Sequence, residues 1–318
     1  MVLNLKFGQK SLLVAVCKQL LKSKGSAICL FILAVAFMVT ISQEVYLYYC
    51  NTNNVTPIYE VGEMVNSFKS PSSEHWFGTD YQGRDVLLRA IAGTATAVKV
   101  GFIASLIAVF IGVFLGAIAG YYGGVVDDIV VWIYSTFAAM PTLLFILSFS
   151  LLVSKGFLFD PIYDFFIVCA KIFNTEPSMF AVYLGIGLTG WVSLCRVVRA
   201  ETMKLKKTAY TEAAIVNGFS SWYIIFKHII PNLFHLVIIY FSMRFAYAIM
   251  TEVIVSYLGL GAQSSPSWGV MISDGQQRLW RGIYWEVGAA TLFMFVLVLC
   301  VNLLSDYLRD ILDPKLKR

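Results

Sequence analysis

The sequence predicts an all-α, polytopic membrane protein with six transmembrane helices. Of its 318 residues, 58% are hydrophobic and only 14% are charged, which is more apolar surface than one soluble core can bury. Long apolar runs also recur, and a helix of about 20 such residues crosses the roughly 30 Å hydrocarbon layer of a bilayer. Six runs are long enough, at residues 26–48, 98–122, 129–153, 180–198, 233–258 and 287–308.

Positive charges orient these spans, because lysine and arginine gather on the cytoplasmic side of membrane proteins. Five lysines precede the first span, six basic residues lie at 196–227 and four follow residue 308, so fifteen lie on these segments against seven on the opposite loops. We therefore expect both termini and the segment 199–231 to be cytoplasmic. The net charge of +5 follows from this topology, and no basic groove with interleaved aromatic residues indicates a nucleic acid partner.

The spans divide the chain into a cytoplasmic tail at 1–25, an outer loop at 49–97, a five-helix core at 98–308 and a second tail at 309–318. The first run is too long for a signal peptide and lacks a small-residue cleavage site, so we expect a retained anchor. In the outer loop, Asp80 and Arg84 are four residues apart. We expect an exposed pair across one helical turn, worth about 0.3–0.5 kcal/mol.

Small residues repeat at every fourth position of the second span. A helix facing lipid gains nothing from such a repeat, so we expect the stripe to be a close helix contact, against either this chain or a second subunit. The members of the stripe are Ala104, Ala108, Gly112, Gly116 and Gly120.

Proline and amphipathic signals mark the next two segments. Pro141 lies inside the third span, where its ring removes a backbone donor and should bend the helix. The segment 155–178 has apolar residues such as Phe165 and Phe166 on one helical face, with Asp164 and Lys171 opposite. We expect a short amphipathic helix there, lying at the outer surface.

The fifth span contains an arginine near its middle. Arg244 lies about 18 Å beyond the cytoplasmic end of the span at 1.5 Å per residue, and a lone arginine at that depth costs about 2.5–3.5 kcal/mol. Tyr240, Tyr247 and Thr251 share its helix face, whereas Glu252 is too far along the axis for a direct pair. These residues form a candidate translocation path, in which Arg244 meets either a substrate carboxylate or an acid of a partner subunit.

Catalytic and cofactor motifs are absent from the sequence. The glycines at 185, 187 and 190 match a dinucleotide-binding spacing, but they lie inside an apolar span with no preceding strand. There is no nucleotide-binding Gly-Lys-Ser/Thr motif, and the three histidines are far apart. We therefore expect no catalytic residue, cofactor or metal. The cysteines lack Cys-x-x-Cys spacing, and pairing of Cys50 with Cys169 is left open.

The polar segment before the fifth span carries the most distinctive motif: Glu212, Ala213 and Ala214, then Gly218, and later Pro231. It resembles the coupling loop of ATP-binding-cassette importer permeases. Gly218 permits the positive φ that ends a helix, and Glu212 complements the helix dipole. We expect the two small alanines to let this helix approach a groove of a partner closely.

Further motifs extend the resemblance over most of the chain from residue 76, at 76–85, 191–200, 256–261, 266–269 and 302–314. Together they are similar to the second permease type of peptide importers, in the oligopeptide, dipeptide and nickel branch. The resemblance implies the type I importer permease fold and a subunit of the inner membrane that moves oligopeptides or dipeptides by alternating access.

The resemblance also implies partners. They are a second homologous permease, two cytoplasmic ATP-binding-cassette ATPase subunits, an external solute-binding protein, the peptide substrate and membrane lipid. Nickel or another small solute is the alternative within the same machinery. A secondary carrier is the alternative from a different class, although the chain shows no internal repeat of the kind that many carriers have.

Overall fold

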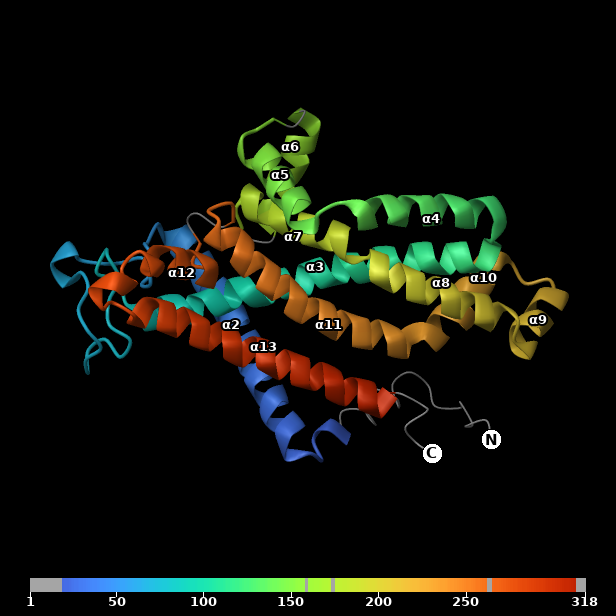
Figure 1. Cartoon of the computed structure of the whole chain (residues 1–318), viewed down its shortest axis with the longest axis horizontal. Helices are drawn as coiled ribbons and strands as arrows, with labels where there is room; N and C mark the ends of the chain where they lie inside the picture. Colours follow the sequence, from blue (N-terminus) through green and yellow to red (C-terminus); the bar gives the residue numbers. More distant parts are fainter. Residues whose placement is uncertain (1–18, 158–159, 173–174, 262–264, 313–318) are drawn as a thin grey trace.

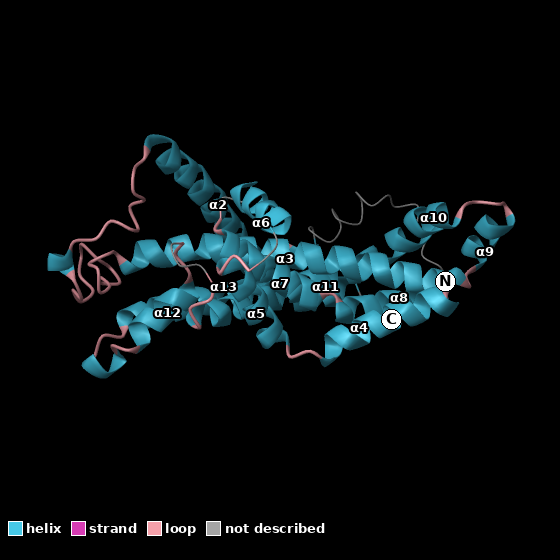
Figure 2. Ribbon diagram, turned by 90° about the horizontal axis from the view of Figure 1, so that it is seen from above, coloured by secondary structure: helices cyan, strands magenta, loops and turns pink. Residues whose placement is uncertain are grey.

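The computed structural model describes residues 19–157, 160–172, 175–261 and 265–312. Within these ranges the regular structure is helical and contains no strand, in agreement with the predicted class (Figure 2). Most of the two predicted tails lies outside the described residues. In chain order the helices are α2 (Lys24–Asn53), η1 (Met64–Asn66), α3 (Val86–Tyr122), α4 (Gly124–Ala139), α5 (Thr142–Ser154), α6 (Asp160–Ile172), α7 (Pro177–Gly190), α8 (Val192–Lys206), α9 (Ala209–Val216), α10 (Ser221–Ile224), the π-helical η2 (Ile225–Ile229), α11 (Ile230–Tyr257), α12 (Trp268–Gln276), η3 (Leu279–Arg281) and α13 (Trp285–Leu312).

The helices α3, α11 and α13 run along one axis of an elongated molecule, and α2 crosses them steeply (Figure 1). At one end lie α12 and the loops around it, and at the opposite end lie α9 and α10. In the described part of the chain, five helical segments are long and apolar enough to cross a membrane, and α4 with α5 makes a sixth if that bent pair is one span. This agrees with the six spans that the sequence predicts.

The third predicted span is broken rather than bent. The axes of α4 and α5 differ by 88°, because Met140 and Pro141 both have extended backbone angles, with ψ of 135° and 109°. Proline disfavours helical angles in the residue before it and cannot donate to the preceding turn. As a result α4 continues alongside α8, whereas α5 and α6 project from the long axis (Figure 1).

The second span begins twelve residues earlier than predicted, at Val86 instead of residue 98. The side chain of Asp85 caps this start by accepting from the Leu88 N–H at 3.0 Å. The predicted start was too late because Arg89 interrupts the apolar run, although it is held in an ion pair with Asp80 within the fold. The outer loop is correspondingly shorter than the predicted 49–97.

The stripe of small residues lies against α7 and α8 of the same chain. Ala104 and Ala108 are 0% and 2% exposed. A Cβ atom added at Gly116 would lie 2.7 Å from the Cys195 carbonyl oxygen, and one at Gly120 would lie 2.5 Å from that of Arg199. Gly112 approaches the Trp191 carbonyl in the same way, at 3.0 Å. The helices are therefore nearly in backbone contact along this line.

The predicted amphipathic helix in 155–178 forms as α6. Phe166 is 4% exposed and its ring lies 5.9 Å from that of Phe180 in α7. Phe165, which was predicted on the same face as Phe166, and Val168 are instead 57% and 56% exposed, so the prediction is wrong for Phe165. Some side chains of the predicted faces lie outside the described ones, namely Asp160, Ile162, Ile172 and Phe173.

The beginning of α2 packs against the end of α13. Leu20 and Cys29 share a cluster with Cys300 and Leu304, and the C-terminal end of α13 points toward the end of the molecule that holds α9 (Figure 1). The two described ends of the chain are thus neighbours. That both face the cytoplasm stays a prediction.

Candidate functional site

The motif before the fifth span forms a short helix with a defined stop. Glu212 lies in the first turn of α9, and the helix ends at Gly218, whose φ is +78°. The Gly218 N–H donates to the Ile215 carbonyl at 2.9 Å and the Phe219 N–H to that of Ala214 at 3.2 Å, which is the Schellman arrangement. A Cβ added at Gly218 would meet nothing within 4 Å, so the glycine is needed for its backbone angle and not for space.

The two alanines of this motif face opposite ways. Glu212 and Ala213 are exposed, but Ala214 is 6% exposed and packs with Ile224 and Ile225. The expectation that both alanines face a partner is therefore wrong for Ala214. Successive helical residues are about 100° apart, so a pair of neighbours divides between the packed and the open face.

Beyond Gly218 the chain exposes a group of large apolar side chains, which we call the inner-end patch. Its rings stack along α10 and η2: those of Phe219 and Tyr223 are 4.8 Å apart, and those of Trp222 and Phe226 are 6.0 Å apart. Exposed apolar groups that gather in this way mark contact surfaces. The members of the patch, with their exposed fractions, are Val216 (87%), Phe219 (48%), Trp222 (48%), Tyr223 (42%) and Phe226 (54%).

Polar bonds tie α8 to the neighbouring long helices, and ring contacts tie the inner-end patch to α3, where Trp222 lies 6.4 Å from both Phe114 and Tyr122. Arg199 of α8 donates through Nε and Nη2 to both carboxylate oxygens of Asp127 in α4, and Lys206 Nζ donates to the Tyr121 carbonyl at the end of α3, at 2.7 Å. Pro231 lies in the first turn of α11, where no backbone donor is needed. Three residues earlier, the ring of His228 lies 5.7 Å from that of Tyr223.

Arg244 lies in the middle of α11 and reaches the start of α8. Its Nη2 donates to Ser193 Oγ at 2.9 Å, and its guanidinium lies 5.2 Å from the centre of the Tyr247 ring. Among the residues that the structure describes, no carboxylate lies within ion-pair distance of this cation. Sequence reasoning missed Ser193, because nothing in the spacing links position 193 to position 244.

Thr251 and Glu252, two further residues of the candidate path, lie buried away from Arg244. Thr251 is 2% exposed and donates to the Tyr247 carbonyl at 2.9 Å. Glu252 is 1% exposed and accepts from the hydroxyls of Ser256 at 2.6 Å and Ser267 at 2.8 Å. In this conformation Thr251 and Glu252 therefore lie inside the fold, where Glu252 ties α11 to the segment before α12. Tyr240 is partly buried and packs against the cluster around Leu233.

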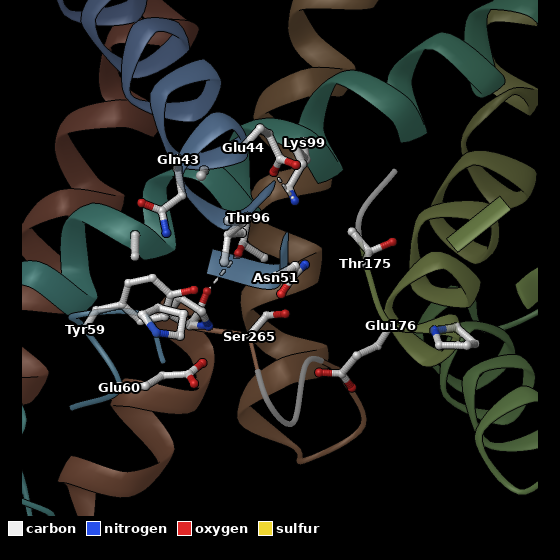
Figure 3. Close-up of a pocket in the computed structure, with 16 residues that line it drawn as sticks. Gln43, Glu44, Asn51, Tyr59, Glu60, Thr96, Lys99, Thr175, Glu176 and Ser265 are labelled. Atoms are coloured by element: carbon white, nitrogen blue, oxygen red, sulfur yellow. Dashed lines mark hydrogen bonds and ion pairs between the residues drawn. The ribbon is translucent and has the colours of Figure 1, made fainter. Parts of the chain in front are cut away.

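A polar pocket of about 480 Å³ opens between the ends of α2, α3 and α7 and the loops at 57–60 and 265–266 (Figure 3). Glu44 and Lys99 form an ion pair inside it at 2.5 Å, and Glu60 and Glu176 lie on its rim. Burial raises the pKa of Glu60 above its usual range, against the opposing effect of the nearby arginines. The sequence did not reveal this pocket, because the five segments that line it come from distant parts of the chain.

A buried ionic cluster lies at the same end of the molecule. The Asp80 side chain is 0% exposed and accepts from Arg84 Nε and Arg89 Nη1, both at 2.7 Å. Arg89 Nη1 also lies 3.4 Å from Oε1 of Glu286 in α13. The predicted exposed helical pair is therefore wrong: Asp80 and Arg84 lie in a loop, and residues far away in the sequence close over them.

Two smaller observations concern His75 and the cysteines. His75 Nδ1 lies 2.8 Å from Asp85 Oδ2, the residue that caps α3. Cys50 and Cys169 are both free thiols, so the disulfide that the sequence left open is not formed.

Comparison with known proteins gives a consistent result. Residues 112–318 match the family described as "Binding-protein-dependent transport system inner membrane component". The chain is 32% identical to the oligopeptide transport system permease protein OppC of Bacillus subtilis, across 82% of this chain and 78% of that protein. It is 35% identical to OppC of Escherichia coli K12, across 79% of this chain and 76% of that protein. It is 33% identical to the dipeptide transport system permease protein DppC of Bacillus subtilis, across 78% of this chain and 71% of that protein.

Proposed function

Since the chain belongs to the family of binding-protein-dependent transport system inner membrane components, we propose that it is the membrane-spanning subunit of an ATP-driven importer of oligopeptides or dipeptides. The observation that carries this proposal is the similarity, over more than three quarters of the chain, to relatives named as oligopeptide and dipeptide permeases. The several long apolar helices agree with a multi-pass protein of the inner membrane.

The proposed complex has the composition that the sequence predicts. This chain pairs with a second homologous permease, two ATPase subunits bind from the cytoplasm, and an external solute-binding protein delivers the peptide. The chain itself carries no catalytic residue or cofactor, so ATP hydrolysis takes place on the partner subunits. Transport proceeds by alternating access of a path between the two permeases.

We assign α9 and the inner-end patch as the surface that meets the ATPase. Glu212 and Ala213 are exposed there beside the large apolar side chains of the patch. Because Arg199 and Lys206 bond α8 to α4 and α3, a displacement of α9 is transmitted to the long helices. This is the mechanical link that coupling requires.

Cysteine cross-linking tests this docking surface with a matched pair of neighbours. In the assembled complex, Ala213→Cys should react with a bifunctional maleimide and join an ATPase subunit, because Ala213 is exposed. Ala214→Cys should not, because Ala214 is 6% exposed and packs inward. Equal cross-linking of both variants, or of neither, would refute the docking assignment.

Uptake into liposomes tests the transport function itself. The complete complex with its binding protein should accumulate peptides only when ATP is enclosed with the ATPase subunits. Uptake driven by an ion gradient without ATP would favour a secondary carrier. ATP-dependent uptake of nickel, with none of peptides, would favour the alternative substrate.

A further inference from the structure

We propose that Arg244, oriented by Ser193 and Tyr247, binds the carboxylate group of the peptide as it passes the middle of the membrane. This inference rests on the proposed function, because it assigns one residue of the path by which the peptide crosses. It concerns a site that the coupling surface does not touch, so the two can be tested separately.

The depth of Arg244 requires a polar environment around its guanidinium. It lies fourteen residues after the start of α11 and thirteen before its end, so about 20 Å of helix extends on either side. An arginine at such a depth is found where it faces other protein groups or a water-filled cavity. Lipid is therefore excluded as its only neighbour.

The chain holds this cation in place without neutralising it. Its described polar contacts are the Ser193 hydroxyl at 2.9 Å and the face of the Tyr247 ring at 5.2 Å. A guanidinium has five N–H donors in a rigid fork that matches a carboxylate, and the bond to Ser193 uses one of them. The side chain is thus oriented, charged and still able to make a bidentate bond.

The surroundings leave room for a ligand to approach. The backbone beside the guanidinium belongs to Gly190, where an added Cβ would lie 3.5 Å from Arg244 Nη1. Ser193 is exposed, and Tyr247 is 45% exposed. Along the same side of α11, Met243 and Met250 are 51% and 48% exposed, and flexible methionine side chains suit a surface that must accept varied ligands.

A carboxylate of the substrate fits these observations better than a fixed acid of the second permease. A permanent buried ion pair adds little net stability, because removing both charges from water offsets their attraction. A peptide in transit brings a carboxylate that must leave water at this depth. A cation that is already oriented there lowers the barrier to that step, and it releases the group when the path opens.

The test uses the complete complex in liposomes and a defined mixture of two alanine tripeptides, one with a free C-terminus and one with an amidated C-terminus. The amount of each tripeptide taken up into the liposomes is measured by mass spectrometry. Arg244→Gln should lower the ratio of free to amidated uptake roughly ten- to a hundredfold, since a hydrogen bond between charged groups is lost. Arg244→Lys should lower it less, and Ser193→Ala less again. The same binding protein delivers both peptides to the wild type and to the variants. Any preference of the binding protein for one peptide therefore cancels when the uptake ratios are compared.

Arg196→Gln is the matched control, because this exposed arginine of α8 stacks on Tyr134 at 4.8 Å and loses the same charge. Its uptake ratio should equal that of the wild type. An unchanged ratio in Arg244→Gln would overturn the proposal. So would an equal loss for both peptides with a lower melting temperature of the complex, which would assign Arg244 to an ion pair with the second permease. Failure of the wild type to import either peptide would instead contradict the proposed function.

Discussion

Adding one methyl group to the glycine stripe should weaken the packing of α3 on α8. In Gly116→Ala the new Cβ lies 2.7 Å from the Cys195 carbonyl oxygen and 2.9 Å from Val198 Cβ. Non-bonded contacts of this kind are comfortable at about 3.5 Å, so the helices must separate locally by roughly 0.6–0.8 Å. Neither contact can relax by turning a flexible side chain, because one atom belongs to the backbone and the other is a Cβ.

The size of the effect follows from two opposing terms. Overpacking of this kind costs about 1–3 kcal/mol, and alanine is a better helix former than glycine by about 0.8–1 kcal/mol. Gly116→Ala should therefore lower the free energy of unfolding by about 0–2 kcal/mol. Gly288→Ala in α13 is the matched control, since its Cβ would meet nothing within 4 Å. It should gain only the helix term and be stabilised by up to about 1 kcal/mol.

Thermal melting of the purified complex, followed by tryptophan fluorescence, compares the two variants. Gly116→Ala should melt below the wild type and Gly288→Ala at or above it, and Gly116→Leu should also reduce the amount of assembled complex. If Gly116→Ala melted at the temperature of Gly288→Ala, the close contact between α3 and α8 would not govern stability, and the reasoning would be refuted.

Three further predictions concern both ends of the molecule. Gly218→Trp should abolish the stimulation of ATPase activity by loaded binding protein, whereas Gly218→Asn, which tolerates a positive φ, should keep most of it. Asp80→Asn removes the acid that Arg84 and Arg89 share, which leaves Arg89 only its longer contact with Glu286 at 3.4 Å, and should destabilise the protein by about 3–5 kcal/mol in denaturant melts; Glu201→Gln, which removes an exposed pair with Lys204, should cost at most about 0.5 kcal/mol. Burial raises the pKa of Asp274, so the protonated carboxyl is favoured in the folded state and its contribution to stability is lost as the pH rises through the folded-state pKa. Asp274→Asn should therefore be more stable than wild type at neutral pH. The difference in stability should vanish toward about pH 4, where the carboxyl is protonated in both states.

Hydropathy and motif spacing were sufficient for the fold class and for the short helix that stops at Gly218. The number of long helices, the family and the turn at Gly218 all follow from local patterns: runs of apolar residues, and a glycine where the chain needs a positive φ. Such signals depend only on residues that are neighbours in the sequence. They can therefore be recognised without knowledge of the tertiary structure.

Features that depend on distant segments could not be predicted. Asp80 was expected in an exposed pair because its spacing to Arg84 is visible, while the approach of Arg89 and Glu286 is not. For the same reason the start of α3 was placed too late, since a charged residue lowers hydropathy whether or not a partner neutralises it. Thr251 was expected beside Arg244 from helical spacing alone, but it is buried because α11 packs against its neighbours on that side.

The length of α3 has a mechanical consequence. At 37 residues it is about 54 Å long, so one uninterrupted rod exceeds the roughly 30 Å apolar layer of a bilayer. One end is anchored by the Arg89 ion pairs and the other by the Lys206 bond to Tyr121. A rigid rod of this length that tilts by about 10° moves its far end by roughly 9 Å. If the proposed docking surface moves with the ATPase, a tilt of this rod carries the displacement to the opposite end of the molecule with no change inside the helix.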